Sequence, residues 1–129
     1  MTHNSFRIYI NKRQWLKVVI FDNHRQYMKK YHAMHGKSKK TIACYSIFGS
    51  RNIHSGSFGQ IMFSNDHMGS GTVAHEVQHF IFDWIRTHYK RLAGWQDEYL
   101  AQLADRITAE FWTQWYKLYL KQFMPKKNK

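Results

Sequence analysis

The segment from Val73 to about Arg91 carries its apolar residues at the spacing of an amphipathic α-helix. A step of about 100° per residue gathers one stripe on a single side of this helix, and it consists of Val73, Val77, Phe80, Ile81, Trp84, Ile85 and His88. The opposite side holds His75, Glu76, His79 and Asp83. Thr72, after Gly71, is a candidate N-cap. The chain must therefore pack this helix with its apolar side against a core, and its opposite side forms a polar front.

The polar front contains the pattern His-Glu-x-x-His at residues 75–79. Residues four apart on a helix are neighbours, so the imidazoles of His75 and His79 can bind one metal ion with Glu76 beside them. This arrangement is typical of zinc hydrolases. A catalytic zinc site usually takes three protein ligands and leaves a fourth position to water, so the pattern requires a third ligand.

A second motif follows at residues 98–104, Glu-Tyr-Leu-Ala-Gln-Leu-Ala, at the start of the next expected helix. Together with His-Glu-x-x-His it resembles the Glu-x-x-Ala-(Asp/Asn) signature of gluzincin metallopeptidases, including minimal gluzincins, ImmA/IrrE-like proteins and phage-type metallopeptidases. The resemblance covers approximately residues 41–109. It implies Zn²⁺ held by His75, His79 and Glu98, with Asp97 as the alternative third ligand. The chain departs from the signature at Gln102, where Asp or Asn would orient a liganding histidine; Asp83 or Asp105 could take that role.

The resemblance also implies the chemistry of a zinc metalloendopeptidase. Zinc would lower the pKa of its water from about 16 to about 7. Glu76, as the catalytic general base, would take the proton and deliver it to the leaving amine. An edge strand beside the helix would bind the extended backbone of a polypeptide substrate. Candidates for stabilising the oxyanion are His88, Tyr89 and Tyr99.

The rest of the chain predicts an α+β fold that resembles a small zincin-like domain. Residues 6–10 are expected to form a strand and residues 12–34 a first helix, broken near Asn23. Residues 41–48, before a turn-like Gly-Ser-Arg-Asn, suggest a hairpin, and residues 59–63 another strand. A long last helix is expected over residues 97–123, with an apolar face of Leu100, Leu103, Ala104, Ile107, Phe111, Trp115 and Leu118. We therefore expect an N-terminal helix, a short, mostly antiparallel sheet of three or four strands, and the helix with the histidine motif followed by the long C-terminal helix.

Length and composition bound the remaining possibilities. With 129 residues, 43% of them hydrophobic, the chain is expected to form one domain over residues 1–124 with a basic tail at 125–129. Cys44 is the single cysteine, which excludes an intrachain disulfide. The N-terminus is too polar for a signal peptide, and charges interrupt every apolar run well before about 20 residues. These features predict a cytoplasmic protein without a transmembrane segment.

The net charge of +12 is distributed unevenly. No acidic residue occurs between Asn23 and Asn65, a stretch that contains Lys29, Lys30, Lys37, Lys39 and Lys40. Such a field attracts nucleic acid or an acidic protein, although basic residues also simply solvate a surface. The alternative function is therefore a nucleic-acid-binding or inhibitory protein, such as a phage factor acting on its host, on a metallopeptidase-like scaffold without peptidase activity. Two further readings stay open: His75 and His79 as ordinary surface residues, and a metal site without peptidase activity.

Overall fold

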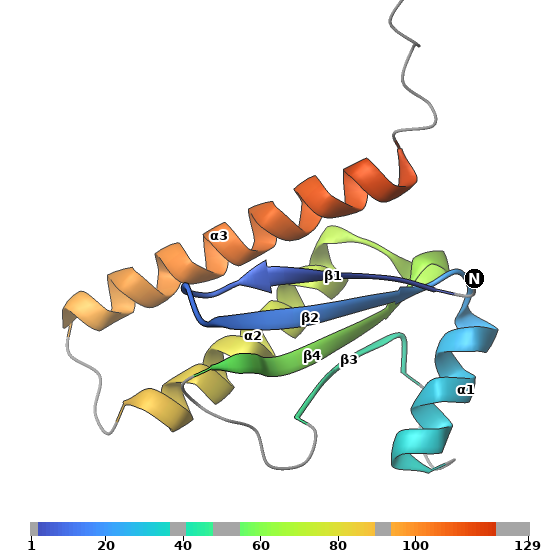
Figure 1. Ribbon diagram of the computed structural model, residues 1–129, viewed down its shortest axis with the longest axis horizontal. Helices are drawn as coiled ribbons and strands as arrows, with labels where there is room; N and C mark the ends of the chain where they lie inside the picture. The colour runs from blue at the N-terminus through green and yellow to red at the C-terminus, as the bar shows by residue number, and fades with distance from the viewer. Residues whose placement is uncertain (1–2, 37–40, 48–54, 90–93, 121–129) are drawn as a thin grey trace, which may run out of the picture.

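The computed structural model describes residues 3–36, 41–47, 55–89 and 94–120 (Figure 1). Its four strands are β1 (His3–Tyr9), β2 (Gln14–Phe21), β3 (Ala43–Ser46) and β4 (Gly56–Ser64). Its three helices are α1 (His24–His35), α2 (Ser70–His88) and α3 (Gly94–Tyr119), and a short 3₁₀ turn, η1 (Asn65–His67), precedes α2. The described part of the chain is therefore α+β, as expected.

The strands form one mixed sheet in the order β1-β2-β4-β3. The outer pairs, β1 with β2 and β3 with β4, are antiparallel, as expected for the strands of a hairpin. The central pair, β2 with β4, is parallel, because the chain leaves β2 through α1 and β3 before it returns to the sheet. This order leaves β3 as an edge strand of the described sheet.

The prediction of one helix over residues 12–34 is wrong in its first half. Residues 14–21 form the central strand β2, which is buried along most of its length. Because helices cover both faces of this strand, its apolar residues do not alternate, and their intervals also fit a helical stripe. The predicted break near Asn23 is confirmed. Its side chain accepts a hydrogen bond of 2.9 Å from the Gln26 amide and so caps α1.

The helices cover the two faces of the sheet unequally. On one face, α2 and α3 pack over the sheet and form the main core, whose residues with 0% exposure include Leu16, Ile20, Phe58, Val73, Phe80 and Ile107. On the other face, a small cluster joins Tyr27 of α1 to Val19, Phe21 and Met62. Figure 1 shows α1 at the end of the sheet where β2 and β4 finish. No helix in the described ranges is long and apolar enough to cross a bilayer.

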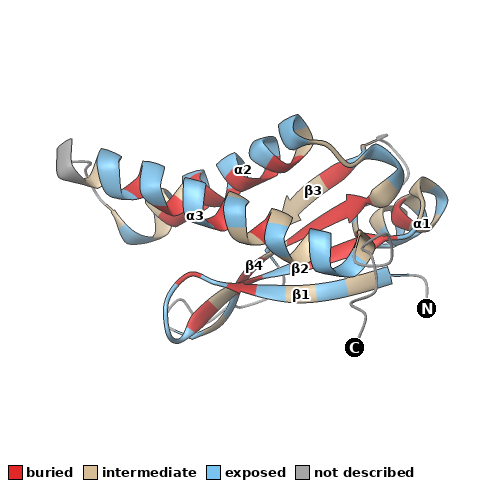
Figure 2. Cartoon of the chain, turned by 90° about the horizontal axis from the view of Figure 1, so that it is seen from above, coloured by how far each residue is buried: buried red, intermediate tan, exposed pale blue. Residues whose placement is uncertain are grey.

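Contacts between aromatic rings show the direction of α2 relative to the strands. Phe58, near the start of β4, packs against Trp84 and His88 near the end of α2, with ring centroids 4.9 and 5.8 Å away. Thus α2 runs antiparallel to β4, and β3, which is also antiparallel to β4, runs in the same direction as α2. Figure 2 shows that α2 and α3 lie beside each other over the sheet and form one layer.

The last helix begins and ends slightly differently from the prediction. It starts at Gly94 instead of residue 97, and the expected end at residue 123 lies outside the described residues. Its expected apolar face is confirmed at four positions, which are Leu100, Leu103, Ile107 and Phe111. Leu118 is expected there too, but it is 42% exposed, so the apolar face of the helix ends before this position. The Arg106 guanidinium donates to the carbonyl oxygens of Tyr9 and Ile10, each at 2.8 Å, which fastens α3 to the end of β1.

Candidate metal centre

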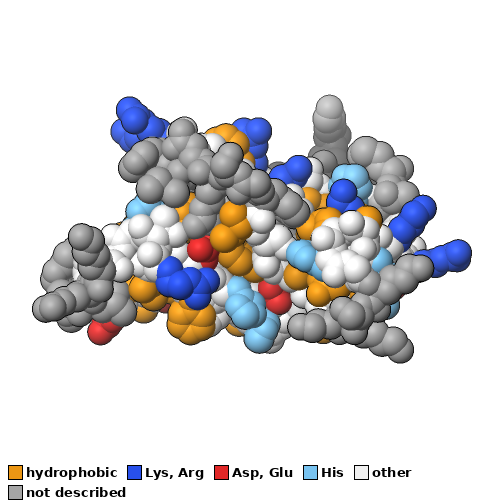
Figure 3. Space-filling view, turned by 90° about the horizontal axis from the view of Figure 1, so that it is seen from below, with side chains coloured by type: hydrophobic (Ala, Val, Ile, Leu, Met, Phe, Trp, Pro, Cys, Tyr) orange, Lys and Arg blue, Asp and Glu red, His pale blue; other side chains and the backbone are white. Residues whose placement is uncertain are grey.

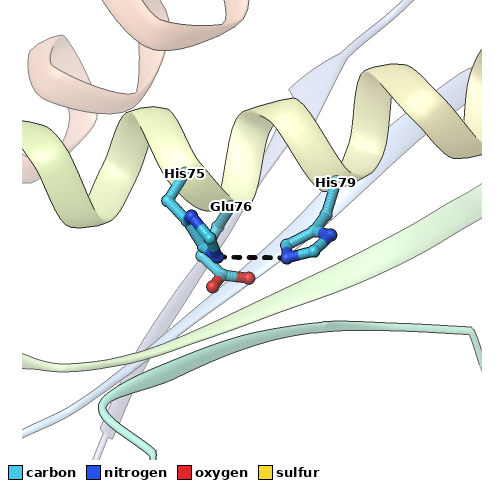
Figure 4. A group of neighbouring side chains, drawn as sticks. All are labelled: His75, Glu76 and His79. Atoms are coloured by element: carbon cyan, nitrogen blue, oxygen red, sulfur yellow. Dashed lines mark hydrogen bonds between the residues drawn. The ribbon is translucent and has the colours of Figure 1, made fainter.

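His75 and His79 point their imidazoles toward one another from successive turns of α2 (Figure 4). Their Nε2 atoms are 3.1 Å apart. Two nitrogens bound to a tetrahedral zinc at about 2.0–2.1 Å would lie about 3.3–3.4 Å apart, so a small change of side-chain torsion suffices to bind the ion. Both imidazoles are exposed. The pair therefore fits the donor chemistry and the spacing of a zinc site.

Glu76 completes the only group of metal-binding side chains found among the described residues. Its ligand atom and those of the two histidines all lie within 4.8 Å of one another. The sequence placed Glu76 on the polar front of α2, but its side chain is only 5% exposed, and its Oε2 has no hydrogen-bond partner among the described residues. Burial raises the pKa of this carboxyl group, and the neighbouring His75 opposes the shift. A carboxylate of raised pKa is a stronger base, which suits a group that takes a proton from water.

The three side chains open into a cleft of about 880 Å³ between α2 and the edge strand β3. On the side of β3, the cleft is lined by Thr41, Ile42, Ala43, Cys44, Tyr45 and Ile47. From α2 it is lined by Gly71, Thr72 and Arg86 in addition to the three motif residues. Figure 3 looks at the molecule from this side, where histidine, acidic, cationic and hydrophobic side chains meet. The start of α2 differs from the prediction: Gly69 is the N-cap, and Thr72 lies in the first turn beside the cleft.

A hydrogen bond between side chains joins β3 to α2. The Tyr45 hydroxyl donates a hydrogen bond of 2.6 Å to Oδ2 of Asp83, which is buried one turn beyond His79. The sequence placed Asp83 on the exposed front of the helix, and this contact explains its burial. Gly59 on β4 makes room for the phenol ring, because a Cβ there would meet Tyr45 Cζ at 2.6 Å. Tyr45 and Gly59 are functional candidates that the sequence motifs did not indicate.

The structure does not bring Glu98 into the group. Glu98 is exposed near the start of α3, where its Oε1 accepts a hydrogen bond of 3.2 Å from Gln102. A groove lined by Ala74 and Gln78 of α2 and by Ala104 of α3 shows that α3 packs on the flank of α2 away from β3. Glu98 is six residues, or about 9 Å of helix, before Ala104. Its role as third ligand stays a prediction.

The other expected residues of the site also lie outside the cleft lining. Asp97 is exposed beside Glu98, and Asp105 lines the groove between α2 and α3. Of the oxyanion candidates, His88 stacks on Phe58, Tyr89 is partly buried against the core and Tyr99 is 41% exposed. Asp83 is the one suggested supporting residue that lies next to the motif.

The lysines suggested for nucleic-acid binding are described only in part. Lys29 and Lys30 are exposed on α1 and, with Arg25, line a second hollow of about 690 Å³. Lys37, Lys39 and Lys40 lie outside the described residues.

Searches against protein-family models, curated proteins and solved structures found no match for this chain. The resemblance to gluzincins therefore rests on the residues of the two motifs alone.

The contact between Tyr45 and Asp83 leads to a test by double-mutant cycle. Removing the ring with Tyr45→Ala should lower the free energy of unfolding by about 3 kcal/mol, from lost packing and a lost hydrogen bond to a charged group. Gly59→Ala should also destabilise the protein, because its Cβ displaces that ring. In the Tyr45→Ala background the same Gly59→Ala change should cost under about 0.5 kcal/mol. Urea denaturation of the four proteins gives the coupling energy, and equal costs of Gly59→Ala in both backgrounds would show that the ring is not what Gly59 accommodates.

The raised pKa of Glu76 predicts how the metal-free protein responds to pH. The folded state holds the Glu76 proton more tightly than the unfolded chain, so stability falls as the pH rises from the unfolded pKa through the folded one. Glu76→Gln removes this penalty, and the metal-free variant should be more stable than the wild type at neutral pH. The difference should shrink toward zero as the pH approaches 4. Thermal unfolding in a chelator, measured across this range, checks the prediction, and a difference that grew with acidity would contradict it.

Proposed function

We propose that this protein is a zinc-dependent metallopeptidase that hydrolyses a peptide bond in the cleft between α2 and β3. One observation carries the proposal: two imidazoles with convergent Nε2 atoms stand beside a buried carboxyl group that has an unpartnered oxygen. A helix with only surface histidines has no reason to bury Glu76 next to them, since burying a carboxyl group without a partner costs free energy. Such a cost is typical of a functional site.

The three motif residues would have two roles, which are metal binding and proton transfer. His75 and His79 would hold the zinc ion through Nε2. Bound zinc supplies an acidic water and polarises a carbonyl group. Glu76 would accept the proton from that water, because burial raises its affinity for a proton, and would pass it to the leaving nitrogen. The exposure of both imidazoles leaves the open side of the site to water and substrate.

Glu98 remains our proposed third ligand. To reach the histidines it would have to give up its hydrogen bond with Gln102 and approach around α2, since α3 packs on the other flank. A zinc titration can decide this. Glu98→Gln should weaken zinc affinity by about tenfold or more if the carboxylate is a ligand, and should leave it unchanged if it is not.

The edge strand β3 supplies the expected binding surface for an extended polypeptide. Its partner on one side is β4, and it lines the cleft along the motif residues. A substrate segment that pairs with the edge of β3 facing the cleft would place its backbone over the two histidines. We propose a cytoplasmic polypeptide as the substrate.

The decisive test separates metal binding from catalysis. Wild-type protein should bind about one zinc per chain and cleave an unfolded polypeptide such as casein. Glu76→Gln should keep the zinc and lose at least about a hundredfold in cleavage rate, the scale of general-base catalysis. His75→Ala should lose both zinc and cleavage, and His67→Ala, in η1 away from the cleft, is the matched control that should lose neither. Full cleavage by Glu76→Gln would remove the mechanism.

A second candidate function rests on the hollow beside α1. Arg25, Lys29 and Lys30 line it from one helix, and no acidic side chain lies on α1. Three cations on one face form the kind of surface that binds a phosphate backbone. In that case the protein would bind nucleic acid, and the metallopeptidase-like frame would have a structural role.

The two candidates predict opposite results. If nucleic-acid binding is the function, Lys29→Glu with Lys30→Glu should abolish it while Glu76→Gln has no effect. Binding of a fluorescent oligonucleotide measured from 50 to 200 mM salt should then lose about tenfold or more in affinity, since each phosphate contact releases counterions. Affinity that does not change with salt would exclude this candidate.

A further inference from the structure

Arg86 is a cation in the cleft that neither motif explains. It lies seven positions after His79 on α2, nearly two turns along the same side of the helix. Its side chain is exposed, it lines the same cleft as the motif residues, and within the described ranges no carboxylate or hydrogen-bond acceptor pairs with it. The nearby Asp83 is buried and accepts the Tyr45 hydroxyl. Arg86 is therefore available to a ligand.

Apolar side chains line the same cleft as this cation. Ile42 and Ile47 line the cleft from the β3 side and are 42% and 45% exposed. On α2, Phe82 lies four residues before Arg86, outside the cleft lining, and is 49% exposed. Large apolar side chains at a cleft, combined with one guanidinium, are suited to a peptide that alternates apolar residues with an acidic one.

We propose that Arg86 selects peptide segments with an acidic side chain on the N-terminal side of the bond to be cut. The proposal rests on the proposed peptidase function and names a specificity residue for it. The charge of the whole chain, +12, favours an acidic partner in the same sense.

The strand directions decide on which side the acid lies. A segment that pairs antiparallel with β3 runs opposite to α2, because β3 and α2 share one direction. Its N-terminal residues then lie toward Arg86 and its C-terminal residues toward Thr72. From His79 to Arg86 the helix rises about 10 Å, and an extended peptide covers about 3.3 Å per residue. The acidic side chain therefore falls about three residues before the cut bond.

A binding experiment on metal-free protein tests the selection without relying on catalysis. Two fluorescein-labelled peptides of ten residues, both amidated at the C-terminus, carry Leu at most positions and differ at three alternate ones, which hold Glu in one probe and Gln in the other. We expect the Glu probe to bind about tenfold more tightly by fluorescence anisotropy, because its carboxylate pairs with a guanidinium. Arg86→Glu should remove or invert this preference. Lys117→Glu, the same charge change at an exposed site on α3, should preserve it.

The outcomes distinguish this proposal from the function it rests on. A Glu preference that survives Arg86→Glu overturns the proposal, and so does the failure of the wild type to bind either probe. If the preference holds and depends on Arg86 but the zinc-loaded protein cleaves nothing, the binding role of Arg86 stands and the peptidase function fails. If the loaded protein cleaves a peptide mixture, acidic residues should be enriched about three positions before the cut, and enrichment after the cut would contradict the antiparallel orientation.

Discussion

The burial of Glu76 between α2 and β3 is the constraint on which the candidate site depends. A carboxyl group in this position loses hydration, and its pKa rises as a result. The position is fixed because α2 is held on two sides: by apolar residues such as Val77 and Phe80 against the sheet, and by the hydrogen bond between Tyr45 and Asp83 against the edge strand. With the helix fixed in this way, His75 and His79 can only project along the open side of the cleft.

The same arrangement gives the cleft two chemically different ends. The Glu76 end has a buried acid beside a pair of imidazoles, which is suited to proton transfer near a metal ion. Nearly two turns beyond His79, Arg86 offers an exposed cation in a cleft that apolar side chains also line, which is suited to recognition. Because both ends belong to one helix, their separation is set by the helical rise and does not depend on a loop.

Some of this could be predicted from the sequence and some could not. The helix that carries the motif, its apolar back and the face of α3 followed from helical periodicity, since these elements bury one side only. Periodicity assigns β2 to a helix, because a central strand that is buried on both faces shows no alternation of apolar and polar residues. Glu76 and Asp83 were placed on an exposed front, because a pattern along one helix cannot show that β3 lies against its flank. Glu98 is implied as a ligand by the resemblance to the gluzincin signature, and a short motif does not reveal on which side of α2 the next helix packs. Tyr45 and Arg86 belong to no motif, so only the cleft itself identifies them.

The central claim is that His75 and His79 hold a zinc ion beside Glu76. The most direct measurement is a zinc-soaked crystal examined by anomalous diffraction at the zinc absorption edge. One strong anomalous peak should lie about 2.0–2.1 Å from Nε2 of both histidines, at the open side of the cleft. Imidazoles that point apart, with no peak between them, would contradict it.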